Sequence, residues 1–202
     1  QRMAAQRWIR TNIAAISGDL QQAATFTALA SKVMACLPRL LGAVEGAFFI
    51  VTEDRRTLKL IATYGKPSGQ EVMFIAVGEG LVGQCARDGQ LLDINNSRLD
   101  DPQLPQGLAA SAAAAILLVP VVRSERCLAV IELAAARPFS EDERAVIDGL
   151  LPIVAMNLEI IERSTRTHRL LEATQEQAAQ LEKQAAELAS LEEHSRLILG
   201  SV

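Results

Sequence analysis

The residues with the clearest chemical meaning lie in the stretch Val77–Cys85, which reads VGEGLVGQC. Its glycines, Gly78, Gly80 and Gly83, match the G-x-G-x-x-G pattern that holds the pyrophosphate of a dinucleotide in a Rossmann fold. That fold needs a long helix after the glycines and then a parallel strand that ends in an acidic residue about 20 positions further on. Here Gly89 follows so soon that the helix has space for only about two turns.

The surrounding pattern also argues against a dinucleotide site. Asp93 ends a short strand, but it lies too close to the glycines, and antiparallel hairpin patterns follow instead of further βαβ units. We therefore interpret the glycines as a strand-to-helix turn that needs their backbone freedom. The exposed amides of a helix N-terminus near Gly80 could still bind an anion.

Cys85 is the most reactive-looking side chain of this stretch. It follows Gly83 in the predicted short helix and lies near Arg87, where a helix dipole and a cation could favour a thiolate. The alternative, which we favour, is a small buried hydrophobic residue. The three cysteines of the chain are widely spaced and form no C-x-x-C pair, which indicates reduced thiols and a cytoplasmic location.

Histidine and basic residues limit the chemistry further. Both histidines, His168 and His194, fall in the C-terminal helical region, so the globular part has no imidazole for zinc, haem or base catalysis. This excludes Ser-His-Asp and Cys-His catalysis within one subunit. The net charge is −4, and lysine and arginine form no basic face, so nucleic acid is not an expected partner.

Hydrophobic periodicity predicts the elements that must position these residues. Helices are expected over 2–17, where Gly18 stops the helix, over 22–41, between Gly80 and Gly89, and from 140 to 202. Strands are expected over 46–54, 58–64, 71–77, 90–95, 114–123 and 126–136. Residues 96–107 form a loop, and the near-apolar run 108–122 is too short to span a bilayer.

The last helix has two further features. Ser140 and Glu143 form a capping box at its start, and Pro152 is expected to kink it. Beyond the globular part, residues of one face are spaced alternately by four and three, which predicts a coiled coil with a weak core seam. These residues are Ile160, Ser164, Thr167, Leu171, Thr174, Ala178, Leu181, Ala185 and Leu188.

Taken in order, these motifs resemble the GAF domain, the small-molecule-sensing module of signalling proteins. The resemblance covers about residues 22–162 and is most specific in AAILLVPVVR (114–123) and in ERCLAVIELAAARPFSEDE (125–143). The flanks, 1–21 and 163–202, resemble the signalling helices that enter and leave GAF domains in bacterial sensor histidine kinases.

The resemblance implies an α+β fold in α/β/α layers. A central antiparallel sheet of about six strands would carry the N-terminal helices and the long C-terminal helix on one face. A ligand pocket would lie on the other face, walled by the third strand, the glycine-led helix and the loop after DIN. We expect its ligand-binding residues to be Phe74, Gly80, Gly83, Cys85, Asp93 and Asn95.

The chain also departs from specialised members of the family. The N-K-x-F-D-E signature of cyclic-nucleotide binders is absent, and no histidine is available for a haem or bilin site, so the cofactor is unknown and no metal is expected. GAF-type methionine sulfoxide reductases use several cysteines close in space. Cys85 could be one of them, but Cys36 is expected to face away.

These observations predict a regulatory GAF domain of a multidomain signalling protein. We expect a bacterial, cytoplasmic sensor histidine kinase of a two-component system, whose parent chain can carry a membrane anchor upstream. The fragment itself would be neither an enzyme nor inserted in the membrane. It would form a homodimer through its N- and C-terminal helices and relay a signal to a downstream domain. The alternatives are a ligand-free dimerisation and relay module or a thiol-dependent methionine sulfoxide reductase.

Overall fold

A six-stranded antiparallel sheet forms the centre of the protein, as expected. The computed structural model describes residues 2–65, 73–95 and 114–199. The strands follow the order β3-β2-β1-β6-β5-β4, so β3 and β4 are the two edges. Their bounds are β1 Ala43–Val51, β2 Thr57–Tyr64, β3 Phe74–Ala76, β4 Leu92–Asn95, β5 Ala115–Arg123 and β6 Arg126–Ala135.

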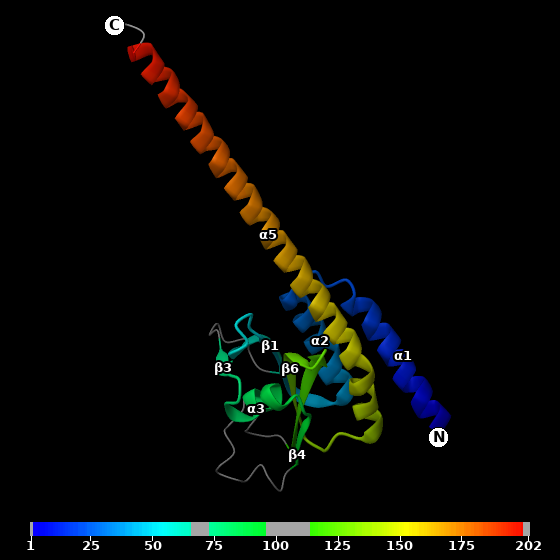
Figure 1. The fold of residues 1–202 in the computed structure, drawn as a ribbon. Helices are drawn as coiled ribbons and strands as arrows, with labels where there is room; N and C mark the ends of the chain where they lie inside the picture. Colours follow the sequence, from blue (N-terminus) through cyan, green and yellow to red (C-terminus); the bar gives the residue numbers. More distant parts are fainter. Residues whose placement is uncertain (1, 66–72, 96–113, 200–202) are drawn as a thin grey trace. The chain divides into compact units, whose positions relative to one another are not determined.

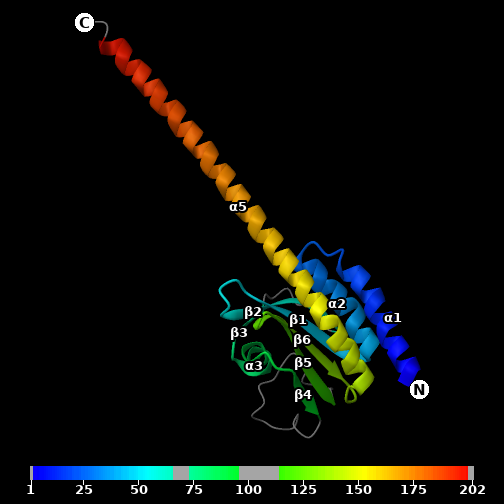
Figure 2. The ribbon, with the colours of Figure 1, turned by 45° about the vertical axis from the view of Figure 1, so that its right-hand side comes forward.

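The helices of the described residues cover the two faces of this sheet. Figure 2 shows α1 (Arg2–Leu20), α2 (Phe26–Leu41) and the first part of α5 (Glu141–Leu199) on one face. The short helix α3 (Gly80–Asp88) lies on the other. The predicted α/β/α layers, with the terminal helices on a single face, are thus confirmed. We call these the helix face and the α3 face.

Several predicted boundaries were wrong. The first helix does not stop at Gly18 but continues to Leu20, since a single glycine weakens a helix without ending it. The second helix begins at Phe26, where the Thr25 side chain accepts a hydrogen bond from the Ala28 amide. The predicted loop 96–107 and the start of the strand predicted over 71–77 lie outside the described residues.

Alternating side chains of β5 and β6 divide the interior into two cores. On the helix face, Leu117 and Ile131 pack with residues of α1, α2 and α5. On the α3 face, Leu118 and Val130 pack with residues of α3. Nearly every residue of these strands is therefore apolar, so a charged residue among them indicates a special role.

The glycine turn places α3 close to β3. Gly78 and Gly80 have positive φ angles of 92° and 61°, which glycine adopts at little cost. A Cβ at Gly83 would lie 2.3 Å from the carbonyl oxygen of Ala76, so the helix can approach the strand only because this residue has no side chain. The Gly78 amide donates to the Gly83 carbonyl at 2.8 Å, which closes the turn. The structure thus agrees with the strand-to-helix interpretation of the motif.

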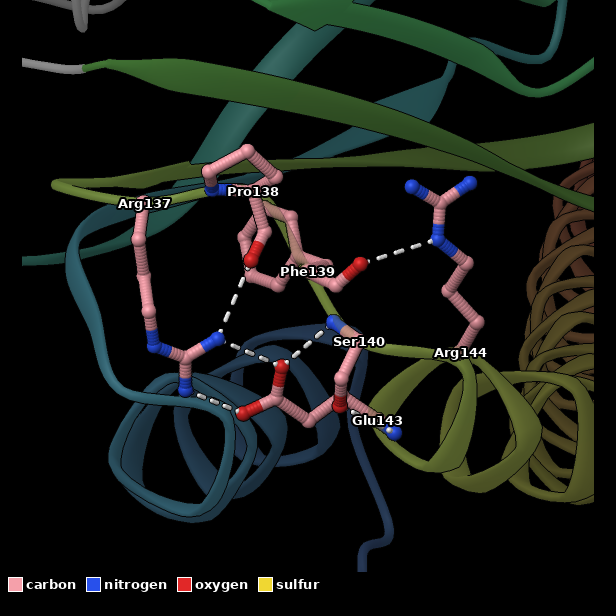
Figure 3. A network of polar contacts seen from close by, with 6 residues as sticks. All are labelled: Arg137, Pro138, Phe139, Ser140, Glu143 and Arg144. Carbon is pink, nitrogen blue, oxygen red and sulfur yellow. Dashed lines mark hydrogen bonds and ion pairs between the residues drawn. The ribbon is translucent and has the colours of Figure 1, made fainter.

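Helix α5 begins in a network of charged and capping contacts (Figure 3). The Ser140 amide donates to the Glu143 carboxylate at 2.8 Å, and the Glu143 amide donates to the Ser140 hydroxyl at 3.3 Å, which confirms the capping box. Arg137 donates two hydrogen bonds to the same carboxylate, at 2.9 and 2.6 Å. The hydrogen bonds from Arg137 in particular, and those from Ser140, lower the pKa of Glu143 to about 2.

The chain divides into two compact units, Gln1–Ile161 and Glu162–Val202. Helix α5 begins in the first unit and makes up the described part of the second (Figure 1). The side chains of residues 163–188 are almost all exposed. Pro152 lies inside the helix without ending it. None of the helices within the described ranges is long and apolar enough to cross a membrane.

Replacing Glu143 with Gln should destabilise the protein by about 1.5 kcal/mol at pH 7, because a charge-assisted pair with Arg137 is lost while one capping acceptor remains. The pKa of Glu143 is lowered from 4.5 to about 2 on folding, so the carboxylate stabilises the protein above pH 4.5 and loses this effect as the pH falls to about 2. Urea unfolding of both proteins at pH 7 and pH 3 should show the difference narrowing. A difference that does not change with pH would contradict this assignment.

Candidate functional site

The six predicted site residues do not form one group. Gly80, Gly83 and Cys85 lie together on α3. Phe74 lies on the edge strand β3 beside it and is 55% exposed. Asp93 and Asn95 lie on β4, at the opposite edge of the sheet.

Asp93 is turned towards the helix face. Its neighbours on β4, Leu92 and Ile94, pack with the α3-face core, so alternation directs Asp93 to the other side. There its carboxylate forms an ion pair of 2.5 Å with Arg144 of α5. Arg144 also donates from Nε to the Phe139 carbonyl at 3.2 Å (Figure 3). Asp93 therefore joins an edge strand to the start of α5.

Cys85 is fully buried in the α3-face core. Its thiol donates to the Gln90 carbonyl at 3.3 Å. Burial, with smaller effects from Cys127 and Asp88, raises the pKa of Cys85 to about 12. The alternative of an activated thiolate near Arg87 was wrong, because Arg87 pairs with Asp88 on the surface and loss of water contact dominates at the thiol. The interpretation as a small buried hydrophobic residue fits these contacts.

The other two cysteines are also poor nucleophiles. Cys127 lies at the start of β6 against the same core as Cys85, and burial raises its pKa to about 11. Cys36 lies on α2 and packs against the helix-face core, as expected, so it is separated from the other two by the sheet. The described residues therefore place two thiols near one core without activating either.

Sequence reasoning missed a polar row on the α3 face. Glu132 of β6 is only 3% exposed, and Ala47 of β1 pairs with it on one side and with Thr63 of β2 on the other. Ala47 belongs to the α3-face core, so Glu132 and Thr63 point to the same side of the sheet. Glu45, two residues before Ala47, pairs with Ala134 on this face.

A signal for this row exists in the sequence. Glu132 is the only charged residue between Cys127 and Ala136, and it sits in phase with Val130 and Ala134. In a strand whose faces are both apolar, such a residue marks the position where a buried polar group is needed. Its partners across the sheet follow only from the strand register.

The α3 face can bind more readily than it can catalyse. Across adjacent strands, Thr63 and Glu132 are separated by roughly 10 Å, with the small Ala47 between them. Carboxylates and a hydroxyl among apolar side chains can accept hydrogen bonds from a ligand that carries donors or a positive charge. The described residues of this face provide no thiolate and no imidazole.

The fold is shared with several solved structures. The GAF domain of a phosphoenolpyruvate-protein phosphotransferase from Coxiella burnetii has a TM-score of 0.68 at 18% identity, over 78% of this chain and 96% of that one. The corresponding domain from Acinetobacter has a TM-score of 0.66 at 15% identity, over 76% and 93%. A free methionine-R-sulfoxide reductase from Neisseria meningitidis, in complex with its substrate, has a TM-score of 0.63 at 19% identity, over 77% and 91%.

These identities establish a common fold and leave the activity open, since the same fold serves a reductase and the domains of phosphotransferases. No curated protein sequence matches the chain. The family pattern of the GAF domain matches residues 23–159, which is well over half of the chain. The sheet order, the layers and this match lead to one conclusion: the chain belongs to the GAF domain family.

Proposed function

We propose that this chain is the sensory or regulatory GAF domain of a multidomain signal-transduction protein, a cytoplasmic bacterial sensor histidine kinase. It dimerises through its terminal helices and relays a signal to a downstream output domain. The observation that carries this proposal is helix α5, which starts at a strong cap on the GAF domain and continues beyond it as far as Leu199. The resemblance of both flanks to signalling helices supports the histidine kinase context.

The second unit supports dimerisation because a single helix of this kind has little to stabilise it. Leu171, Leu181 and Leu188 lie on the predicted seam and are 54 to 65% exposed. Isolated helices in water are marginally stable, and helices in proteins gain most of their stability from packing an apolar face. A second copy of the chain, packed along the same seam, would bury these leucines.

The ligand function is supported by the polar row on the α3 face. Buried polar groups among apolar side chains are typical of small-molecule sites, where a few of them orient the ligand. Glu132 is the most buried residue of the row. It lies on β6, next to β5, and α3 packs against both of these strands. A relay module that binds no ligand is the second candidate, since exposed seam residues on α5 would serve it equally well.

A thiol-dependent reductase is the least supported alternative. One solved structure with this fold is a free methionine-R-sulfoxide reductase, which gives the idea its basis. Thiol chemistry needs a thiolate as nucleophile, and burial raises the pKa values of Cys85 and Cys127 to about 12 and about 11. Neither thiol would be ionised to a useful extent at neutral pH.

Replacing Leu171 with Glu should weaken the dimer at least tenfold, because the charge would have to be buried in the seam. Leu170 is a matched control: it is adjacent, is 61% exposed against 54% for Leu171, and lies outside the seam. Leu170→Glu should change the dimer dissociation constant less than threefold. Sedimentation velocity over a concentration series measures both, and a wild-type chain that is monomeric at high micromolar concentration would rule out the dimeric relay.

Replacing Glu132 with Gln should reduce ligand binding at least fivefold, because the nearly isosteric amide puts an N–H donor where the row offers an acceptor oxygen on the α3 face. The control is Glu79→Gln, since Glu79 is exposed at the start of α3 and makes no capping hydrogen bond. Native mass spectrometry of freshly purified protein, followed by a screen of small metabolites, gives the readout. A wild-type protein that carries no ligand and binds none in the screen would favour the ligand-free relay.

Cys85 should resist alkylation in the folded protein. With a pKa of about 12, roughly one Cys85 thiol in 10⁴ or fewer is ionised at pH 7.5. Iodoacetamide labelling followed by peptide mass spectrometry should therefore be at least 100-fold slower for Cys85 than in guanidinium-unfolded protein. Labelling of the folded protein at the unfolded rate would revive the reductase alternative.

A further inference from the structure

Helix α5 contains an intrinsically weak turn where it crosses the sheet. Pro152 has no amide, so the carbonyl of Asp148 cannot receive the usual hydrogen bond from four residues further on. Gly149 lies one residue after Asp148 and adds the backbone freedom of glycine to the same turn. Sharp bends in helices occur mainly at proline and at small flexible residues. Residues 148–152 are therefore the part of α5 that bends most easily.

The first helix contacts α5 at this turn. A Cβ at Gly149 would lie 2.3 Å from Cδ1 and 3.3 Å from Cγ1 of Ile13 in α1. Ile13 therefore occupies the space that a side chain at 149 would need. Both ribbon views show α1 beside the first part of α5 (Figures 1 and 2). A displacement of α1 would thus act on α5 at its weakest turn.

The same turn of α5 also borders an open groove of about 460 Å³. The groove lies between α5 and the end of β5, beyond Leu118, the last residue of β5 that pairs with β4. Its lining residues are Gly89, Leu91, Val119, Pro120, Val122, Arg123, Asp148, Leu151, Pro152 and Ala155. The turn is therefore packed against α1 and also borders this groove.

Two ion pairs tie α5 to the sheet, one on each side of the weak turn. Before it, Arg144 pairs with Asp93 of β4 at 2.5 Å. After it, Glu159 pairs with Arg123 at the end of β5. The weak turn thus lies between two points at which α5 is held to neighbouring strands of the same sheet, β4 and β5.

We propose that residues 148–152 of α5 form a hinge, and that α1 operates it through the contact between Ile13 and Gly149. A shift of α1 would alter the packing at Gly149 and bend the helix into or away from the groove. Because Val154, Leu158 and Ile161 pack in the helix-face core, the bend would shift the segment after Pro152 along the sheet and so move the start of the helix beyond Ile161. The hinge follows from the contacts alone, and only its use as a relay rests on the proposed signalling function. A signal can select between two bends only if it favours one of them in free energy.

Hydrogen exchange with mass spectrometry, on the full chain, tests the hinge. Amides of residues 149–156 should exchange at least tenfold faster than those of 143–148, whose helical start is capped. Pro152→Ala restores a backbone donor and should slow exchange across 149–156 at least tenfold while leaving 143–148 unchanged. Equal protection of the two segments in the wild-type chain would overturn the hinge.

A double-mutant cycle tests the contact with α1. Gly149→Ala should force Ile13 aside and speed exchange in α1 at least threefold, while it slows exchange in the turn itself. Ile13→Val removes Cδ1, the atom 2.3 Å from the added methyl group, so Gly149→Ala should no longer loosen α1 in that background. Gly18→Ala is the control, because a Cβ at this position in α1 meets no atom within 4 Å.

The results separate the two proposals. If Ile13→Val leaves exchange across 149–156 unchanged and Gly149→Ala loosens α1 equally in both backgrounds, α1 does not operate the turn and the inference is wrong. Exchange across 149–156 that is at least tenfold faster than across 143–148, and that depends on Ile13, would establish the hinge. This would hold even in a chain that sediments as a monomer and binds no ligand. Conversely, a rigid turn in a dimeric, ligand-binding chain would reject the hinge and leave the proposed function in place.

Discussion

The central strands β1, β6 and β5 have to bury both of their faces, and most of the structure depends on this constraint. One face needs the cover of α1, α2 and α5, and the other needs α3. Since the side chains of a strand alternate between faces, the residues of β6 from Ala129 to Ala135 point to one face or the other in turn. The carboxylate of Glu132 therefore points to the α3 face, like its partner Ala47 on β1. The free-energy cost of burying this carboxylate must therefore be offset by groups on the α3 face.

Helix α3, which covers the α3 face, is short, and its backbone lies against the backbone of the sheet. The nine residues of α3 contribute few side chains to the core, among them Val82, Cys85 and Ala86. A larger residue at Gly83 would lift the helix from β3, because its Cβ would meet the carbonyl oxygen of Ala76. The glycine pattern that resembles a nucleotide fingerprint is therefore explained by packing. Cys85 fits the same packing constraint. Its side chain is small and needs no contact with water, so it suits a helix that lies this close to the sheet.

The features that the sequence predicts well are local ones. The capping box of Ser140 and Glu143 and the six strands depend on neighbouring residues, and their patterns are complete within a few positions. Asp93 was predicted as a pocket residue from the family resemblance, as part of the DIN stretch that leads into a pocket wall, but its direction depends on which face β4 turns to the helices. Glu132, Thr63 and Ala47 meet through the register of three strands, which no single segment encodes. The same is true of Ile13 and Gly149, which come from helices more than a hundred residues apart.

Helix α5 combines a firm start with a weak turn, and the two features have opposite physical effects. At its start, Arg137, Ser140 and Glu143 satisfy backbone donors and fix the direction in which the helix leaves β6. About two to three turns later, Gly149 and Pro152 remove a side chain and a hydrogen bond from a helix that otherwise packs well against the sheet. A helix that served only to cover the core would gain stability from alanine in place of Pro152, whereas a side chain in place of Gly149 would meet Ile13 of α1. Their presence beside α1 makes sense if the helix must hold one end fixed while the other changes direction, and that is the mechanical requirement of a domain placed between an input helix and an output helix.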